Sequence, residues 1–194
     1  MVTFHVSCPK CGEEDTIELA PEEMDEEYGI TRIGLIHRGH VLIVDIDAHM
    51  FVRGAYLTSL PRVFPNVKLF FKDYRVTIHP VIKSDSQLAI IHDGEKHIDI
   101  RAFYKYFLRI YEILSTALEV MSRNAKYGWY RGDISIFDTT FDIALGKGVM
   151  LLLKTNIRSW DQRTQILRRI HSIILREGIP NEEVLREIVL SINK

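Results

Sequence analysis

Short runs of apolar residues, several of them alternating with polar residues, dominate the first half of the chain and predict β-strands. Residues 30–36 and 41–46 are two such runs, and the Arg38-Gly39 pair between them is typical of a two-residue hairpin turn. A third run at residues 50–57 completes a predicted antiparallel meander. Further strands are predicted at residues 2–7, 16–19, 67–71, 75–78, 87–92, 96–98, 134–137, 141–145 and 149–154.

A helical periodicity replaces this pattern between Asp99 and Tyr127. Charged residues recur there every three or four positions, and most of the remaining positions are large and apolar, which is typical of a helix covered on several sides. Asp99 is a suitable N-cap and Gly128 a suitable C-terminal stop. Two more helices are predicted at 159–177, which opens on a capping-box sequence, and at 182–192. We therefore expect an α+β fold, in which an antiparallel sheet of meander and hairpins packs on a long buried central helix, with two C-terminal helices and a small N-terminal appendage.

Composition narrows the class of protein without identifying it. The chain has 194 residues, 46% of them hydrophobic, which is enough for one packed core, and its formal net charge is −1. That balance gives no bulk attraction to nucleic acid or to an anionic membrane. Apolar runs stay below the ~18 residues of a spanning helix, and the N-terminus lacks the pattern of a signal peptide, so we expect no membrane partner and a cytoplasmic location. Two cysteines within the first eleven residues exclude a disulfide framework.

The strongest chemical signal is Cys8-Pro9-Lys10-Cys11-Gly12. A turn of this kind holds two thiolates on one side, which suits a zinc ion bound tetrahedrally by nitrogen and sulfur. The five residues resemble one knuckle of a zinc ribbon, and a ribbon needs a second knuckle. His37 and His40 flank the predicted Arg38-Gly39 turn, so their imidazoles would lie on the same side of the paired strands. Cys8, Cys11, His37 and His40 would make a closed, structural zinc site.

Alternatives to this ligand set stay open in the sequence. His5 precedes Cys8 by three residues and is a rival ligand. The cysteines could also carry no metal, or form a redox pair, although they neither follow a core strand nor open a long helix as redox pairs do. We expect residues 1–29 to form a zinc-knuckle appendage and residues 30–194 a single α+β domain.

Two other sets of residues offer weaker functional hypotheses. Arg163, Arg169 and Arg176 lie in the first C-terminal helix and are candidates for binding nucleic acid, because clustered arginines can neutralise phosphates. Asp45 and Asp142 are candidate acids of a metal-dependent hydrolase. The signature motifs of nucleotide-binding and hydrolytic enzymes that we sought, such as G-x-S-x-G and H-E-x-x-H, do not occur in the sequence.

The order of elements in the body of the chain resembles the roadblock/longin class of regulatory domains. The likeness lies in the antiparallel run from Gly34 to Tyr56, interrupted at Arg53-Gly54, and in the long helix after it. Members of that class dimerise and bind GTPases or other proteins, so the resemblance implies a scaffold; the additional strands and C-terminal helices depart from that fold. The first hypothesis is a non-enzymatic, zinc-binding scaffold with a protein partner or self-association. The alternatives are a nucleic-acid-associated zinc-ribbon protein, in transcription or RNA processing, and a divergent metal-dependent hydrolase.

Overall fold

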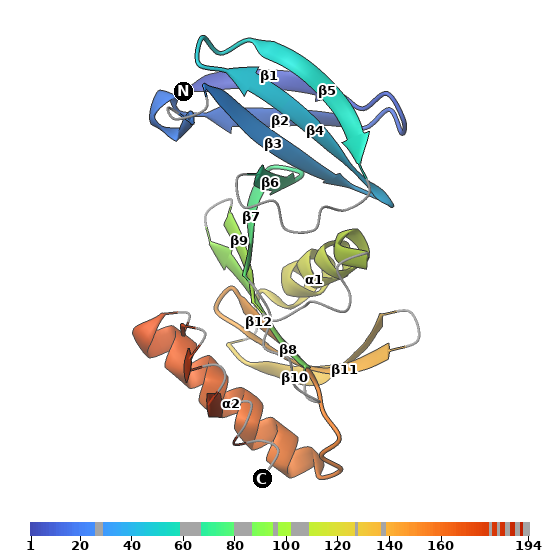
Figure 1. Cartoon of the computed structure of the whole chain (residues 1–194). Helices are drawn as coiled ribbons and strands as arrows, with labels where there is room; N and C mark the ends of the chain where they lie inside the picture. Colours follow the sequence, from blue (N-terminus) through green and yellow to red (C-terminus); the bar gives the residue numbers. More distant parts are fainter. Residues whose placement is uncertain are drawn as a thin grey trace. The chain divides into compact units, whose positions relative to one another are not determined.

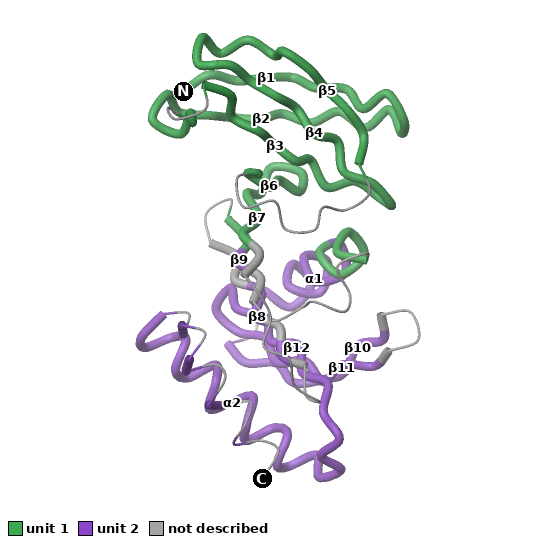
Figure 2. The backbone as a smooth tube through the Cα atoms, viewed as in Figure 1, with its two compact units in different colours: residues 1–77, 96–98, 107–114 green, residues 78–95, 99–106, 115–194 purple. Residues whose placement is uncertain are grey.

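A computed structural model of the chain describes residues 1–25, 29–58, 67–79, 87–94, 97–101, 109–126, 128–136, 139–178, 180–181, 183–184, 187–188 and 191. Within these ranges it contains twelve β-strands, two α-helices and one short 3-10 helix, Pro21–Glu23 (Figure 1). The chain divides into two compact units (Figure 2). Unit 1 comprises residues 1–77, 96–98 and 107–114, and unit 2 comprises residues 78–95, 99–106 and 115–194.

The larger sheet of unit 1 is built on the predicted meander. Its strands, in the order β7-β6-β3-β4-β5, are β7 (Tyr74–His79), β6 (Val67–Phe71), β3 (Ile30–His37), β4 (His40–Asp47) and β5 (Val52–Thr58). β3, β4 and β5 pair antiparallel, whereas β6 runs parallel to β3. Residues His37 and His40 are partners in the β3–β4 register, so the predicted hairpin turn at Arg38-Gly39 is confirmed.

A two-stranded sheet covers one face of this larger sheet. It consists of β1 (Val2–Ser7) and β2 (Glu14–Leu19), which pair antiparallel and lie over β3 and β4 in Figure 1. Every second residue of β2 points inward, and Ile17 and Leu19 are fully buried. Each such side chain stabilises the fold by roughly 1.5–3 kcal/mol. The core between the two sheets contains Cys8, Ile17, Leu19, Ile33, Leu35, Leu42, Val44, Ile46 and Phe70.

Unit 2 is organised around four antiparallel strands. Its strands, in the order β10-β11-β12-β8, are β10 (Tyr130–Ile136), β11 (Thr139–Gly146), β12 (Val149–Lys154) and β8 (Gln87–Gly94). Helix α2 (Trp160–Glu177) buries Leu167, Ile170 and Ile174 against these strands. The Ser159 hydroxyl accepts a hydrogen bond from the Gln162 amide, and Gly178 closes the helix at φ 81°. The predicted helix at 159–177 is therefore confirmed.

The predicted fold class, with its long buried central helix and two C-terminal helices, is wrong. Asp99, the expected N-cap, lies in strand β9 (His97–Arg101), and helix α1 extends only over Ile110–Asn124. The alternation His97-Ile98-Asp99-Ile100-Arg101 has the two-residue period of a strand, and this local signal prevails over the helical spacing of the charges.

Helix α1 is also less buried than expected. Its buried residues form a single stripe with helical spacing: Ile110, Ile113, Leu114, Ala117 and Met121. The helix ends at Asn124, before Gly128. The Asn124 side chain donates a hydrogen bond to the carbonyl of Val120 in the last turn.

The structure does not test two other expectations, the last helix and the domain boundary. Most of the last predicted helix, 182–192, lies outside the described residues, and the boundary at residue 29 stays a prediction. Neither α1 nor α2 is both long enough and apolar enough to cross a lipid bilayer.

The turn between β4 and β5 depends on one carboxylate. Asp47 Oδ1 accepts hydrogen bonds from the amides of His49 and Phe51, both at 2.9 Å, and Oδ2 accepts from Arg53. The Phe51 amide in particular, together with Arg53, outweighs desolvation and lowers the pKa of Asp47 below 3.8. A lowered pKa in the folded state contributes stability above the unfolded-state pKa, and that contribution disappears as the pH falls through the folded value.

Asp47→Asn should therefore lower the melting temperature at pH 7, and the difference from the wild type should shrink as the pH falls below about 3.8. Thermal unfolding followed by circular dichroism across this range measures both effects. Asp45→Asn is the control: its carboxylate binds the half-exposed Arg32 at 2.9 Å, and an exposed ion pair contributes little. Equal losses in the two variants at pH 7 would refute this role of Asp47.

Candidate metal site

The first half of the site is the turn between β1 and β2. Cys8 donates its amide to the Glu13 carbonyl and accepts from the Gly12 amide at its own carbonyl, both at 2.9 Å. Gly12 closes the turn at φ 72°, a left-handed conformation that a residue with a Cβ adopts at a cost of about 1–2 kcal/mol. Cys8 is only 1% exposed, whereas Cys11 is exposed. The turn thus presents the Cys8 sulfur from inside the core and the Cys11 sulfur from the surface of the protein.

The second half of the site is the turn between β3 and β4. His37 and His40 are directly opposite each other in the register and are 1% and 3% exposed. Between them, Gly39 has φ 78°, which glycine adopts without strain. Their rings meet edge to face, with centroids 5.1 Å apart. Pairing across a two-residue turn places both imidazoles on the same side of the hairpin, as the sequence predicts.

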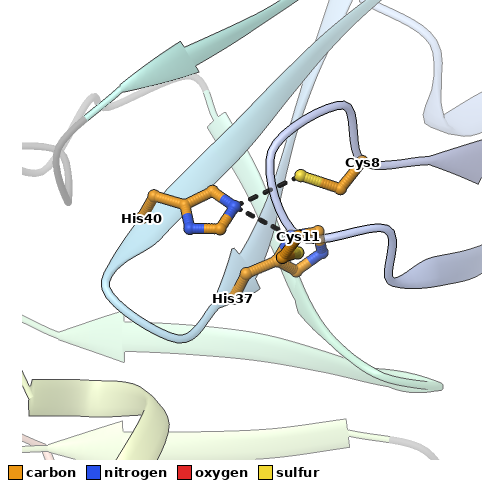
Figure 3. Close-up of side chains that lie close together, drawn as sticks. All are labelled: Cys8, Cys11, His37 and His40. Atoms are coloured by element: carbon orange, nitrogen blue, oxygen red, sulfur yellow. Dashed lines mark hydrogen bonds between the residues drawn. The ribbon is translucent and has the colours of Figure 1, made fainter.

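The two turns bring four ligand atoms to one point (Figure 3). The atoms are Cys8 Sγ, Cys11 Sγ, one nitrogen of His37 and one of His40, and all lie within 4.8 Å of one another. His37 Nδ1 lies 3.3 Å from His40 Nε2, and the distances from Cys8 Sγ to His40 Nε2 and from Cys11 Sγ to His37 Nδ1 are 3.2 and 3.4 Å.

The three shorter separations are close to the edges of a coordination tetrahedron. With metal–sulfur bonds of about 2.3 Å and metal–nitrogen bonds of about 2.0–2.1 Å, nitrogen–nitrogen edges are about 3.3 Å and nitrogen–sulfur edges about 3.5 Å. The observed nitrogen–nitrogen separation of 3.3 Å and the two nitrogen–sulfur separations of 3.2 and 3.4 Å agree with these expected edges to within about 0.3 Å. The geometry is consistent with a bound metal ion such as zinc.

Hydrogen bonds on the far side of each ring decide which nitrogen can bind a metal. His37 Nε2 lies 2.7 Å from the carboxylate of Asp15, and His40 Nδ1 lies 3.2 Å from the carbonyl oxygen of Arg38. Both partners are acceptors, so these nitrogens carry the protons in the neutral rings. The lone pairs of His37 Nδ1 and His40 Nε2 then point at each other and at the sulfurs. Such a convergence of electron pairs is unfavourable unless a cation or a proton lies between them.

The pKa shifts of Cys8 and His37 favour their charged forms, whereas burial and the neighbouring Cys8 raise the pKa of Cys11. Burial opposes ionisation of Cys8, but the amides of Cys11 and Lys10 and the ring of His40 outweigh it and lower the pKa of this thiol from 9.0 to about 6. Burial also opposes protonation of His37, yet Asp15 and Cys8 raise its pKa above 6.5. A thiolate beside a ring that favours a positive charge is an environment prepared for a cation.

The four-residue cluster does not include the other predicted site residues. His5, the rival ligand, is exposed on β1, and its Nδ1 lies 3.3 Å from the Thr16 hydroxyl. Asp45 binds Arg32, and Asp142 binds Arg131 and Arg163. Both acids thus already have arginine partners.

The three arginines predicted to contact nucleic acid differ in their surroundings. Arg163 Nε lies 2.7 Å from Asp142 Oδ2, and its Nη1 donates to the carbonyls of Ile157 and Arg158. Arg176 donates to the Ser172 carbonyl, and Arg169 is exposed. A role of these residues in binding nucleic acid stays a prediction.

Asp15 is the functional residue that the sequence analysis missed. In sequence it stands beside Glu14 among several acids and looks solvated. The signal that could have identified it is position: Asp15, Ile17 and Leu19 alternate, so an acid at the first of these three positions faces the core with the other two. Buried acids are seldom found without a partner.

Comparisons of the chain with protein-family models, with curated proteins and with solved structures found no match. The fold and the site therefore define this chain through its own geometry, as a strand-rich protein with a candidate Cys2His2 metal site.

Asp15→Asn should weaken metal binding by about tenfold or more, because the carboxylate fixes the tautomer of His37 and makes its Nδ1 a better ligand. Competition with a chromophoric chelator measures the dissociation constant. Glu14→Gln, which changes the exposed acid next to it, is the matched control and should bind as the wild type does. Identical affinities for the two variants would show that Asp15 does not support the site.

Proposed function

We propose that this chain is a zinc-binding protein in which the zinc is structural and the folded N-terminal unit is a scaffold for protein interaction. The observation that carries the proposal is the convergence of Cys8, Cys11, His37 and His40, whose ligand atoms all lie within 4.8 Å of one another. Two thiolates with two imidazoles are a donor set typical of zinc. Four protein ligands leave no position for water or substrate, which is the arrangement of structural rather than catalytic zinc sites.

The position of the site in the fold supports a structural role. A two-stranded sheet is marginally stable by itself, and β1–β2 joins unit 1 through a small apolar core. The candidate ligands tie the turn of this hairpin to the turn of β3–β4, from residues 26 and 32 positions apart along the chain. A metal that binds only the folded arrangement stabilises it by its whole binding free energy.

The scaffold part of the proposal rests on what surrounds the site. The four ligand residues lie at hairpin turns, and the carboxylate nearest to them, Asp15, is buried and bound to His37. This arrangement supports a fixed surface at the two turns, and the Asp15 carboxylate is already engaged in holding His37. A rigid strand surface held by zinc is suited to binding another protein.

Purified wild-type protein should contain one equivalent of zinc, and Cys11→Ser and His40→Ala should each lose most of it. Inductively coupled plasma mass spectrometry of protein exchanged into metal-free buffer measures the content. His5→Ala is the control, because His5 precedes the motif by three residues but lies outside the cluster. Zinc retained in His40→Ala and lost in His5→Ala would replace the proposed ligand set with the rival one.

Removing zinc with a chelator should loosen unit 1 selectively. Amide hydrogen exchange should accelerate in β1, β2 and the β3–β4 turn, because these segments carry the ligands, while β11 and β12 of unit 2 keep their protection. Hydrogen–deuterium exchange with mass spectrometry resolves the segments. Uniform acceleration over both units, or none in β1–β2, would contradict a local structural role for the metal.

A further inference from the structure

Strand β5 exposes several large apolar side chains. No residue of β5 is buried, and Val52, Tyr56 and Leu57 are 49%, 45% and 43% exposed. Phe51, which precedes the strand, is exposed as well. Four of the nine large exposed hydrophobic residues found in the described part of the chain therefore fall within seven consecutive positions.

The strand also lies at the edge of its sheet. It is the last strand in the order β7-β6-β3-β4-β5, and among the described residues β4 is the strand that pairs with it (Figure 1). An unpaired edge presents backbone donors and acceptors that another strand can bind. β5 thus combines an open edge with exposed apolar residues at positions that point to both faces of the sheet.

Other edge strands of the molecule carry the polar groups that discourage such pairing. β10 contains the exposed Asp133, and β2 contains the exposed Glu14 and Glu18. The exposed positions of β1 are Thr3, His5 and Ser7. On β5 the charged residue is Arg53, at the irregularity where the β4–β5 register shifts, and it binds Asp47 of its own chain. The surface of β5 is therefore open to pairing and carries a charge that is already neutralised.

We propose that two copies of this chain associate through β5, with the strands antiparallel and Ala55 opposite Ala55 of the partner. This register places the two-fold axis at the middle residue of Val52–Thr58. It places Tyr56 opposite the partner's Gly54, where the ring can cover the glycine backbone, and Arg53 opposite the partner's Leu57. No like charges face each other. The strand is thus complementary to itself, which a two-fold interface requires.

This interface joins the larger sheets of two molecules into one continuous sheet. Backbone hydrogen bonds between the two β5 strands would satisfy the open edges, and Val52, Tyr56 and Leu57 would be covered from both sides. The inference is independent of zinc chemistry, since β5 contributes none of the four candidate metal ligands.

Position 55 gives the sharpest test, because in this register it faces itself across the two-fold axis. Ala55 is exposed, so Ala55→Lys and Ala55→Glu should both fold. Each places like-charged side chains opposite each other, with Cβ atoms about 4.5–5.5 Å apart, and should raise the dimer dissociation constant by about tenfold or more. An equimolar mixture of the two variants places opposite charges together and should recover the dimer.

Sedimentation velocity of the full-length protein over a range of concentrations measures the association. The wild type should reach twice the 22.6 kDa mass of the chain. Thr3→Lys and Thr3→Glu, at an exposed position of β1, are the matched controls and should dimerise as the wild type does. Zinc content and circular dichroism, measured for every variant, separate a lost interface from a lost metal site.

Three outcomes would overturn the proposal. A wild-type chain that stays monomeric at all concentrations removes the interface, and unchanged dimers of Ala55→Lys and Ala55→Glu place it elsewhere. The third concerns register: Leu57 lies about 13 Å from Leu57 of the partner, so mixing Leu57→Lys with Leu57→Glu should recover less dimer than mixing the variants at position 55. Greater recovery at position 57 would contradict the pairing of Ala55 with itself.

Discussion

The structure of unit 1 depends on the meeting of two hairpin turns. Each turn closes on a glycine with positive φ, Gly12 or Gly39, and each presents two ligand atoms on one side. Either pair alone is an ordinary turn. Brought together, the four atoms are electron-pair donors in contact, and this contact is favourable when a metal cation or protons lie between them. A metal ion bound by all four atoms would link the two turns directly.

The surrounding residues are arranged around that requirement. Asp15 and the Arg38 carbonyl orient the two rings, and the amides at the Cys8 turn stabilise its thiolate. The apolar core between β1–β2 and the larger sheet begins at Cys8 itself, so coordination and hydrophobic packing share a residue. Burial and metal binding are therefore coupled in unit 1: loss of the ion should weaken the packing of the small sheet, and loss of packing should disperse the ligands.

The candidate site could be predicted from the sequence because both of its halves are local. A Cys-x-x-Cys turn and two histidines around a two-residue hairpin each fix their own side chains, so only the meeting of the halves needed the fold. The prediction of a long central helix was wrong for the opposite reason. The charge spacing after Asp99 fits a helix, but it does not show where that helix begins, and strand alternation at Ile98 and Ile100 takes precedence. The burial of Asp15 was not predicted, because it depends on which face of β2 points inward. The acid alone does not indicate that face.

The central claim is that one ion is bound by two sulfurs and two nitrogens of the same chain. X-ray absorption spectroscopy at the zinc edge of the purified protein tests it most directly, because the spectrum counts the ligand types and measures their distances. The account predicts two sulfur neighbours at about 2.3 Å and two nitrogen neighbours at about 2.0–2.1 Å. A shell without sulfur, or one with more than two sulfurs, would contradict it.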